Sequence, residues 1–206
     1  AMLLKGLTAW YLLRRTYRVK KGDTIVVHAA AGGVGLILCQ WAKRLGAKVI
    51  GIVGNAEKAA LAKANGCYRT FLLDAEDWVA GVKKLTQGVG VPVVYDSVGK
   101  DTFTRSLEAL RPLGLMVTYG NSSGPVPAFA PLELSRRGSL FLTRPTLDHY
   151  VPTAAALADA VCELFGVVKS KQVKIHVGQT YALKDAAQAH RDLESRKTTG
   201  STLLAP

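Results

Sequence analysis

The sequence has few cysteines and no long hydrophobic run. Cys39, Cys67 and Cys162 are odd in number and far apart, which excludes a disulfide framework and matches no zinc-ligand spacing. We therefore expect a reducing, cytoplasmic compartment and no metal site. No segment near the start has the parts of a signal peptide. No apolar run reaches the roughly 18 residues that suggest a transmembrane helix, so we expect no membrane partner.

Acidic residues are also scarce, and the chain is strongly basic as a result. Its 27 Lys and Arg residues outnumber 15 Asp and Glu residues, which gives a net charge of +12. Such a charge favours anionic partners, for example a phosphorylated cofactor or a nucleic acid. The basic residues are nevertheless spread along the chain, which is typical of solvated helix faces. Hydrophobic residues make up 49% of the 206, enough for a large core.

Predicted strands and helices alternate over about 120 residues of the chain. Apolar runs predict strands at 24–29, 48–53, 70–73, 91–95, 115–119 and 139–143, and helices are predicted at 2–17, 34–45, 56–64, 76–85, 101–110 and 153–168. This alternation predicts an α/β protein with a doubly wound, Rossmann-type parallel sheet of six strands and helices on both faces. Residues 173–206 do not continue the alternation, so we expect a domain over 1–172 followed by a C-terminal tail.

A turn rich in small residues joins the first predicted strand to the next helix. Residues 28–35 read HAAAGGVG, which fits G-x-G-x-x-G with Ala30 in the first place. Gly32 would let the backbone approach a pyrophosphate, and Gly35 would let the helix lie close to the strand. Free N–H groups at the helix start attract phosphate. Because the pattern follows a strand and opens a helix, it predicts a dinucleotide site.

The end of the second predicted strand indicates which dinucleotide is bound. An NAD site usually has an acidic residue here to bind the ribose hydroxyls, but this chain has Gly54 and Asn55. No carboxylate is present to repel a 2′-phosphate, and Lys58 adds a positive charge one turn into the next helix. The sequence therefore predicts NADPH rather than NADH as the cofactor.

Other polar residues near the strand ends have simpler predicted roles. Asp96 ends the fourth strand, where we expect it to cap the following helix. The four histidines, His28, His149, His176 and His190, have no ligand-like spacing, so we expect them to be structural or exposed.

Five motifs together resemble a known enzyme family. HAAAGGVG, VVYDSVG, GLMVTYGNSSG, TRPTL and LESRKTTGSTLL are similar to motifs of the NADPH-dependent quinone oxidoreductases. These are the zeta-crystallin-like, zinc-free branch of the medium-chain dehydrogenase/reductase superfamily. The resemblance covers essentially the whole chain and implies the cofactor domain and tail of such an enzyme, without its N-terminal GroES-like domain. It also implies hydride transfer to a quinone or another conjugated carbonyl such as an enone, low activity of this portion alone, and a homodimer formed through the edge strand at 139–143.

The resemblance implies roles for individual residues, although it names no catalytic one. The implied cofactor contacts are Gly33 and Val34 at the pyrophosphate; Gly54, Asn55, Lys58 and Arg196 at the 2′-phosphate; Tyr119, Gly120, Asn121 and Ser122 along the cleft; Thr8 and Tyr11 near the nicotinamide; and Leu142 and Thr143 beside its carboxamide. Relatives often place a tyrosine near the 2′-phosphate where this chain has Leu73, which weakens the expected preference for NADPH.

Two other functions remain open at this point. Some zeta-crystallin relatives bind single-stranded RNA, and a basic group near the N-terminus lies beside aromatic residues that are compatible with base stacking. This group comprises Lys5, Arg14, Arg15, Arg18, Lys20 and Lys21, with Trp10 and Tyr17 nearby. A methyltransferase shares the predicted sheet and glycine turn, but usually has an acidic residue at the end of the second strand, which is missing here.

Overall fold

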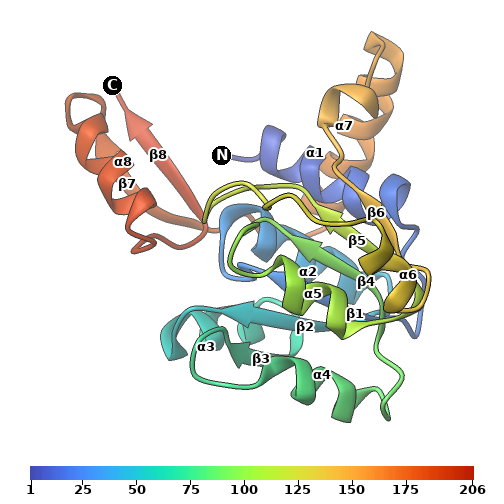
Figure 1. The fold of residues 1–206 in the computed structure, drawn as a ribbon. Helices are drawn as coiled ribbons and strands as arrows, with labels where there is room; N and C mark the ends of the chain where they lie inside the picture. Colours follow the sequence, from blue (N-terminus) through green and yellow to red (C-terminus); the bar gives the residue numbers. More distant parts are fainter.

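Six strands form one fully parallel sheet in the computed structural model, which describes residues 1–206. The strand order is β3-β2-β1-β4-β5-β6, so the chain winds outward from β1 in both directions (Figure 1). The strands are β1 (Thr24–His28), β2 (Lys48–Val53), β3 (Cys67–Leu72), β4 (Val91–Asp96), β5 (Leu110–Thr118) and β6 (Phe141–Thr143). This confirms the predicted doubly wound Rossmann fold.

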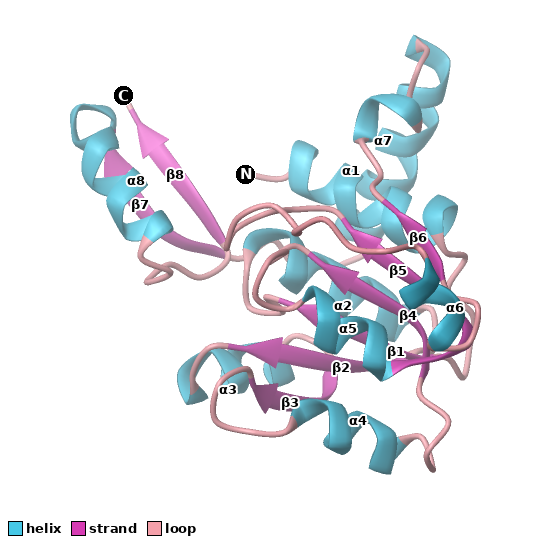
Figure 2. Cartoon of the chain, in the orientation of Figure 1, coloured by secondary structure: helices cyan, strands magenta, loops and turns pink.

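Helices cover both faces of the sheet (Figure 2). One face carries α1 (Leu3–Tyr11), α2 (Gly33–Arg44), α3 (Ala56–Ala64) and α7 (Ala154–Lys169), and the other carries α4 (Trp78–Leu85), α5 (Phe103–Ala109) and the short α6 (Leu132–Arg136). A π-helical turn over Leu12–Thr16 continues α1. None of the helices is both long and apolar enough to cross a bilayer.

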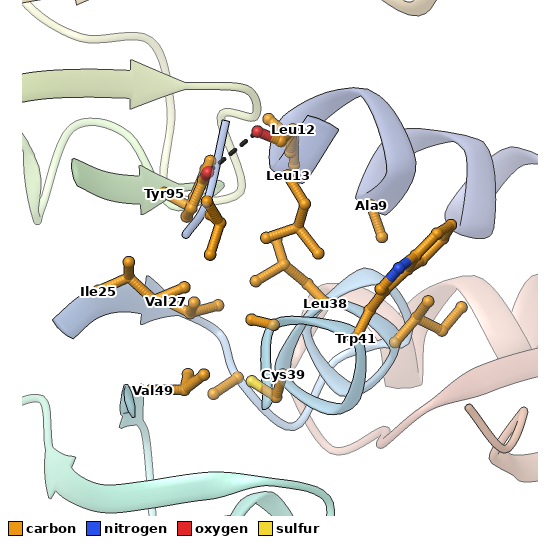
Figure 3. Close-up of a cluster of buried hydrophobic side chains, with 14 of the residues drawn as sticks. Ala9, Leu12, Leu13, Ile25, Val27, Leu38, Cys39, Trp41, Val49 and Tyr95 are labelled. Carbon is orange, nitrogen blue, oxygen red and sulfur yellow. Dashed lines mark hydrogen bonds between the residues drawn. The ribbon is translucent and has the colours of Figure 1, made fainter. Parts of the chain in front are cut away.

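The core consists of two hydrophobic clusters, one on each face of the sheet. Side chains alternate along a strand, so Ile25 and Val27 of β1 join the cluster under α1 and α2, whereas Val26 joins the cluster under α4 and α5. Figure 3 shows the first cluster, in which the buried Tyr95 hydroxyl donates a 2.9 Å hydrogen bond to the Leu12 carbonyl. This bond ties the centre of the sheet to the π-helical turn.

The C-terminal segment forms a second, two-stranded sheet. Strands β7 (Val177–Ala182) and β8 (Ser201–Ala205) pair in parallel, with α8 (Ala186–Glu194) between them. Figure 1 shows this unit standing apart from the main sheet. The segment leading to it is still anchored, because Val173 is buried in the main core and Gln40 forms two side-chain hydrogen bonds with the Lys174 backbone.

Several predicted boundaries were wrong. Strand β5 begins at Leu110, five residues before the predicted start at 115, because Leu110 pairs with Val91 before an irregular stretch. Leu113 in that stretch has a positive φ of 59°, which no apolar pattern signals. Strand β3 begins at Cys67 rather than 70, and α6 was not predicted at all.

Candidate functional site

Two cavities meet at the glycine turn, at the carboxyl ends of the parallel strands. The first has a volume of about 200 Å³ and the second about 370 Å³, and both are lined by Ala29 and Gly32. The first extends toward the ends of β2 and β3, and the second extends along the start of α2 toward Tyr119. This crevice at the strand ends is where open α/β sheets bind their ligands.

The glycines of the turn stand where a side chain would not fit. A Cβ atom on Gly35 would lie 2.4 Å from the Ala29 carbonyl oxygen, and one on Gly33 would lie 2.9 Å from the Gly200 carbonyl oxygen. Ala29 itself has a φ of 49°, in the left-handed region that few residues other than glycine adopt. The turn is therefore closely packed backbone, as its composition predicted.

The start of α2 offers unpaired hydrogen-bond donors. No side chain caps this helix, and the N–H groups of Gly33, Val34 and Gly35 have no backbone acceptor. Unpaired N–H groups and the helix dipole together make an anion site. These residues therefore fit the pyrophosphate of a dinucleotide.

Two cationic side chains and no acidic one line the first cavity. The Lys58 ammonium donates a hydrogen bond to the Arg196 carbonyl, so the C-terminal segment reaches the end of β2. Burial, and then the charge of Arg196, lowers the pKa of Lys58. An anion between these two cations would relieve their mutual repulsion. The Arg196 guanidinium also lies 3.6 Å from the Asp101 carboxylate, which orients it at the edge of the cavity.

Gly54 and Asn55 shape the space between these cations and β2. A Cβ atom on Gly54 would meet nothing within 4 Å, so this position is open, as predicted. The Asn55 side chain accepts a 2.9 Å hydrogen bond from the Lys58 backbone N–H and thereby caps α3. Asn55 therefore fixes the start of the helix that carries Lys58.

The segment after β5 contributes to both cavities. Tyr119 lines the second cavity, where burial raises the pKa of its hydroxyl, and Ser122 lines the first. A Cβ atom on Gly120 would lie 2.7 Å from the Ser97 carbonyl oxygen, so the ends of β4 and β5 are closely apposed. Asn121 and Leu142 line a separate, neighbouring cavity.

The structure does not bring Thr8, Tyr11 or Thr143 into either cavity. The Thr8 hydroxyl donates to the Leu4 carbonyl within α1. Tyr11 is buried and stacks on Tyr150 with a ring-centroid distance of 4.6 Å. The nicotinamide-side roles of these residues stay predictions.

His28 was not expected among the residues of the site. It is buried, which agrees with the structural role expected of it, but it also lines the first cavity at the end of β1. Its position directly before the glycine turn was the available signal. Asp96 does not cap α5 as expected, because Thr102 occupies the N-cap position. Its carboxylate instead orders the turn before the helix, where it accepts hydrogen bonds from the Val98 and Gly99 N–H groups and the Thr102 hydroxyl.

Several other chemistries do not fit the residues present. Residues 120–124 read GNSSG, which matches the G-x-S-x-G pattern of hydrolases, but the strand leads into a loop rather than the helix that a nucleophile elbow needs. No group of three or more His, Cys, Asp or Glu side chains is placed to hold a metal ion. The residues of this chain therefore do not fit a zinc site.

The N-terminal basic group does not present a base-stacking surface. Trp10 is only 2% exposed, and its ring nitrogen donates a 2.7 Å hydrogen bond to Glu163. Arg14 pairs with the same carboxylate at 2.7 Å. The Tyr17 hydroxyl is engaged by Asp23. The two contacts with Glu163 join α1 and its π-helical continuation to α7, so the RNA-binding alternative gains no support from the structure.

Together, the parallel sheet, the glycine turn and the crevice define a Rossmann-type dinucleotide-binding domain. Residues 33–175 match the model of the zinc-binding dehydrogenase family, and the chain belongs to this family. Its six-stranded sheet and unpaired donors at the start of α2 agree with that membership.

Known relatives confirm the resemblance to quinone oxidoreductases. A quinone oxidoreductase of Pseudomonas aeruginosa is 50% identical over all of this chain and 63% of the relative, and a 2-haloacrylate reductase of Burkholderia is 45% identical over 62% of its length. The solved structure of Escherichia coli quinone oxidoreductase complexed with NADPH superposes with a TM-score of 0.97, at 51% identity, over all of this chain and 64% of that one. The chain thus spans slightly less than two thirds of these relatives.

Proposed function

We propose that this chain binds NADPH in the two joined cavities and serves an oxidoreductase that reduces a quinone. The observation that carries the proposal is the arrangement of charge and donors in the crevice. The cationic residues Lys58 and Arg196 lie together at one end, and the N–H groups without an acceptor at the start of α2 lie in the middle. This spacing of an anion site and a second cationic site suits a dinucleotide with a 2′-phosphate. The NADPH in the Escherichia coli relative supports the same cofactor.

Different residues bind different parts of the cofactor. The N–H groups of Gly33 and Val34 hold the pyrophosphate, Lys58 and Arg196 hold the 2′-phosphate, and Tyr119 borders the nicotinamide half. NADPH supplies the hydride when it is bound, and the protein supplies orientation and exclusion of competing reactions. Holding the reacting carbons close contributes much of the rate.

The acceptor belongs to the class of conjugated carbonyl compounds. Relatives are named for quinones and for a 2-haloacrylate, and both contain a carbon–carbon double bond conjugated with a carbonyl group. A hydride adds to the electron-poor end of such a system in either case. We infer that a quinone is the acceptor because the quinone oxidoreductases are 50% and 51% identical to this chain, compared with 45% for the haloacrylate enzyme.

Titration with NADPH and NADH, followed by dihydronicotinamide fluorescence, tests the cofactor. Each charge-assisted hydrogen bond contributes about 1.5–3 kcal/mol, so we expect NADPH to bind at least about tenfold more tightly. The double variant Lys58→Met/Arg196→Met should lose this preference while retaining its affinity for NADH. Lys63→Met, an exposed change on the same helix, is the matched control. Equal affinities for both cofactors in the unmodified protein would refute the assignment.

We also propose a homodimer formed through β6. This strand is at the edge of the sheet, and Phe141 and Leu142 are 59% and 36% exposed. An exposed apolar edge strand favours pairing with a second copy. Light scattering at tens of micromolar protein should give the mass of a dimer, and the mass of a monomer would contradict this proposal.

The division at residue 172 and the cytoplasmic setting are further proposals. The unit beyond residue 172 exposes Val177, Leu183, Leu193 and Leu204, each 41–57% exposed, which suits a surface that a GroES-like catalytic domain would cover. All three cysteines are unpaired, which favours a reducing compartment. Limited proteolysis that cuts between the core and β7 first would support the division, and early cuts within the main sheet would oppose it.

A further inference from the structure

Lys5 is the only charged residue that lines the second cavity. It lies in the first turn of α1, where its side chain is partly buried. The rest of the lining comes from the glycine turn, from the ends of β4 and β5, and from the C-terminal segment, all of them uncharged there. The cofactor contacts assigned above do not include Lys5.

The aliphatic stem of Lys5 lies directly against Gly33. A Cβ atom on Gly33 would lie 2.7 Å from Cδ and 2.8 Å from Cε of Lys5, so the missing side chain at position 33 makes room for the lysine stem. A lysine commonly packs its stem on other groups and leaves its charged head free. The ammonium is one bond beyond Cε, which places it beside the start of α2.

The Lys5 ammonium has no counter-ion in the protein. None of the ion pairs in the structure includes it. Burial lowers the pKa of Lys5, and no acidic side chain opposes this shift. A negative charge close to a lysine favours its charged form, so an anion in the second cavity would offset the cost of burying this ammonium.

The charge of a dinucleotide requires such a cation at this place. The start of a helix supplies only about half of an elementary charge, whereas a pyrophosphate bridge is doubly negative. Lys58 and Arg196 line the first cavity and not the second. Of the side chains beside the unpaired N–H groups of Gly33 and Val34, only Lys5 can neutralise the remaining charge.

We propose that Lys5 is a further cofactor-binding residue, whose ammonium donates a hydrogen bond to a non-bridging oxygen of the pyrophosphate. This inference rests on the proposed NADPH site. NADPH and NADH share the pyrophosphate, so Lys5 strengthens the binding of both equally. Lys58 and Arg196 contact the 2′-phosphate and therefore determine the choice between them.

The variant Lys5→Met tests this assignment, because methionine keeps an unbranched stem over Gly33 and removes the ammonium. Lys43→Met is the matched control, since Lys43 is exposed in the last turn of the same α2 and its loss changes the net charge equally. Titration with each cofactor, followed by dihydronicotinamide fluorescence, gives the dissociation constants. We expect Lys5→Met to bind both NADPH and NADH about tenfold more weakly, the lower end of the range for a hydrogen bond to a charged group. The ratio of the two constants should stay as in the unmodified protein.

Salt separates an electrostatic contact from a change in packing. The screening length falls from about 10 Å in about 0.1 M salt to about 3 Å in about 1 M. The difference in affinity between Lys5→Met and Lys43→Met should therefore narrow when the titrations are repeated in about 1 M NaCl. Disturbed packing of α1 on Gly33 predicts a difference that salt leaves unchanged.

The outcomes distinguish this inference from the proposed function. If neither cofactor binds the unmodified protein at millimolar concentration, the proposed function fails first. If both bind and Lys5→Met equals Lys43→Met, Lys5 does not contact the pyrophosphate, although the NADPH site stands. A loss confined to NADPH would place Lys5 at the 2′-phosphate, and a loss that salt does not reduce would make its role structural; either result overturns the inference.

Discussion

Replacing Gly35 by alanine tests whether the glycine turn is as closely packed as its geometry indicates. The added Cβ would lie 2.4 Å from the Ala29 carbonyl oxygen and 2.8 Å from two backbone atoms of Ala30. These are main-chain atoms, so no flexible side chain can move aside. Ala29 already has a φ of 49°, which leaves the turn little freedom to adjust.

The size of the effect follows from this crowding. Overpacking of a close contact destabilises by about 1–3 kcal/mol, and in a chain of this length each kcal/mol moves the thermal midpoint by about 2–4 °C. The midpoint of Gly35→Ala should therefore fall by about 2 to 12 °C.

Gly166→Ala is the matched control for this substitution. Gly166 lies in α7, where an added Cβ would meet nothing within 4 Å. Removing a glycine from a helix interior stabilises by about 0.5–1 kcal/mol, so this variant should melt about 1–4 °C higher. Differential scanning calorimetry of both variants measures the two shifts. If the midpoints of both variants shift by the same amount in the same direction, close contact with the backbone is not the reason that position 35 needs glycine.

Three further predictions follow from other contacts. Glu163→Ala removes the 2.7 Å hydrogen bonds from Trp10 and Arg14. The thermal midpoint should therefore fall by about 2–8 °C. An unchanged midpoint would mean that α1 and α7 are held together by apolar packing alone. Burial, and then the charge of a neighbouring tyrosine, raises the pKa of Tyr11 to about 12, above the usual value of about 10. The resulting stability is complete below pH about 10 and is lost as the pH rises to about 12. The free energy of unfolding measured with urea should therefore decline over that range, and the decline should be shallower in Tyr11→Phe. An equally steep decline in the variant would refute the assignment. Cys162 is exposed and the other two thiols are buried, so Ellman's reagent should modify one thiol in the native protein and three after unfolding; three fast native thiols would contradict the buried packing.

Much of the fold could be predicted because local pattern and tertiary packing agree in the centre of the sheet. Strand β2 and helix α3 have the predicted bounds, since apolar runs and the Asn55 cap specify them locally. Prediction was weaker for the edge strand β3 and for the start of β5. Strand β3 exposes Tyr68 and Arg69, so its hydrophobic run is shorter than the strand. The start of β5 depends on pairing with Val91, which is a tertiary contact.

The same distinction applies to the candidate site. The glycine turn and the open strand end at Gly54 are local features, and both could be predicted from neighbouring residues. The contact between Lys58 and Arg196 joins residues 138 positions apart, and only the resemblance to a family indicated it. Histidine spacing gave no sign that His28 lines the cavity, because its hydrogen-bond partner Ser106 comes from another element of the fold.

The path of the tail across the glycine turn bears on the kinetics of ligand exchange. Gly200 donates a hydrogen bond to the Ala31 carbonyl and forms a bridge with Gly32, while Arg196 and Thr198 line one cavity and Gly200 and Thr202 line the other. A molecule that fills both cavities therefore contacts residues of this crossing. Its residence time is thus set partly by how firmly the last residues of the chain are held, and substitutions in β8, distant from the reacting carbons, would change the dissociation rate.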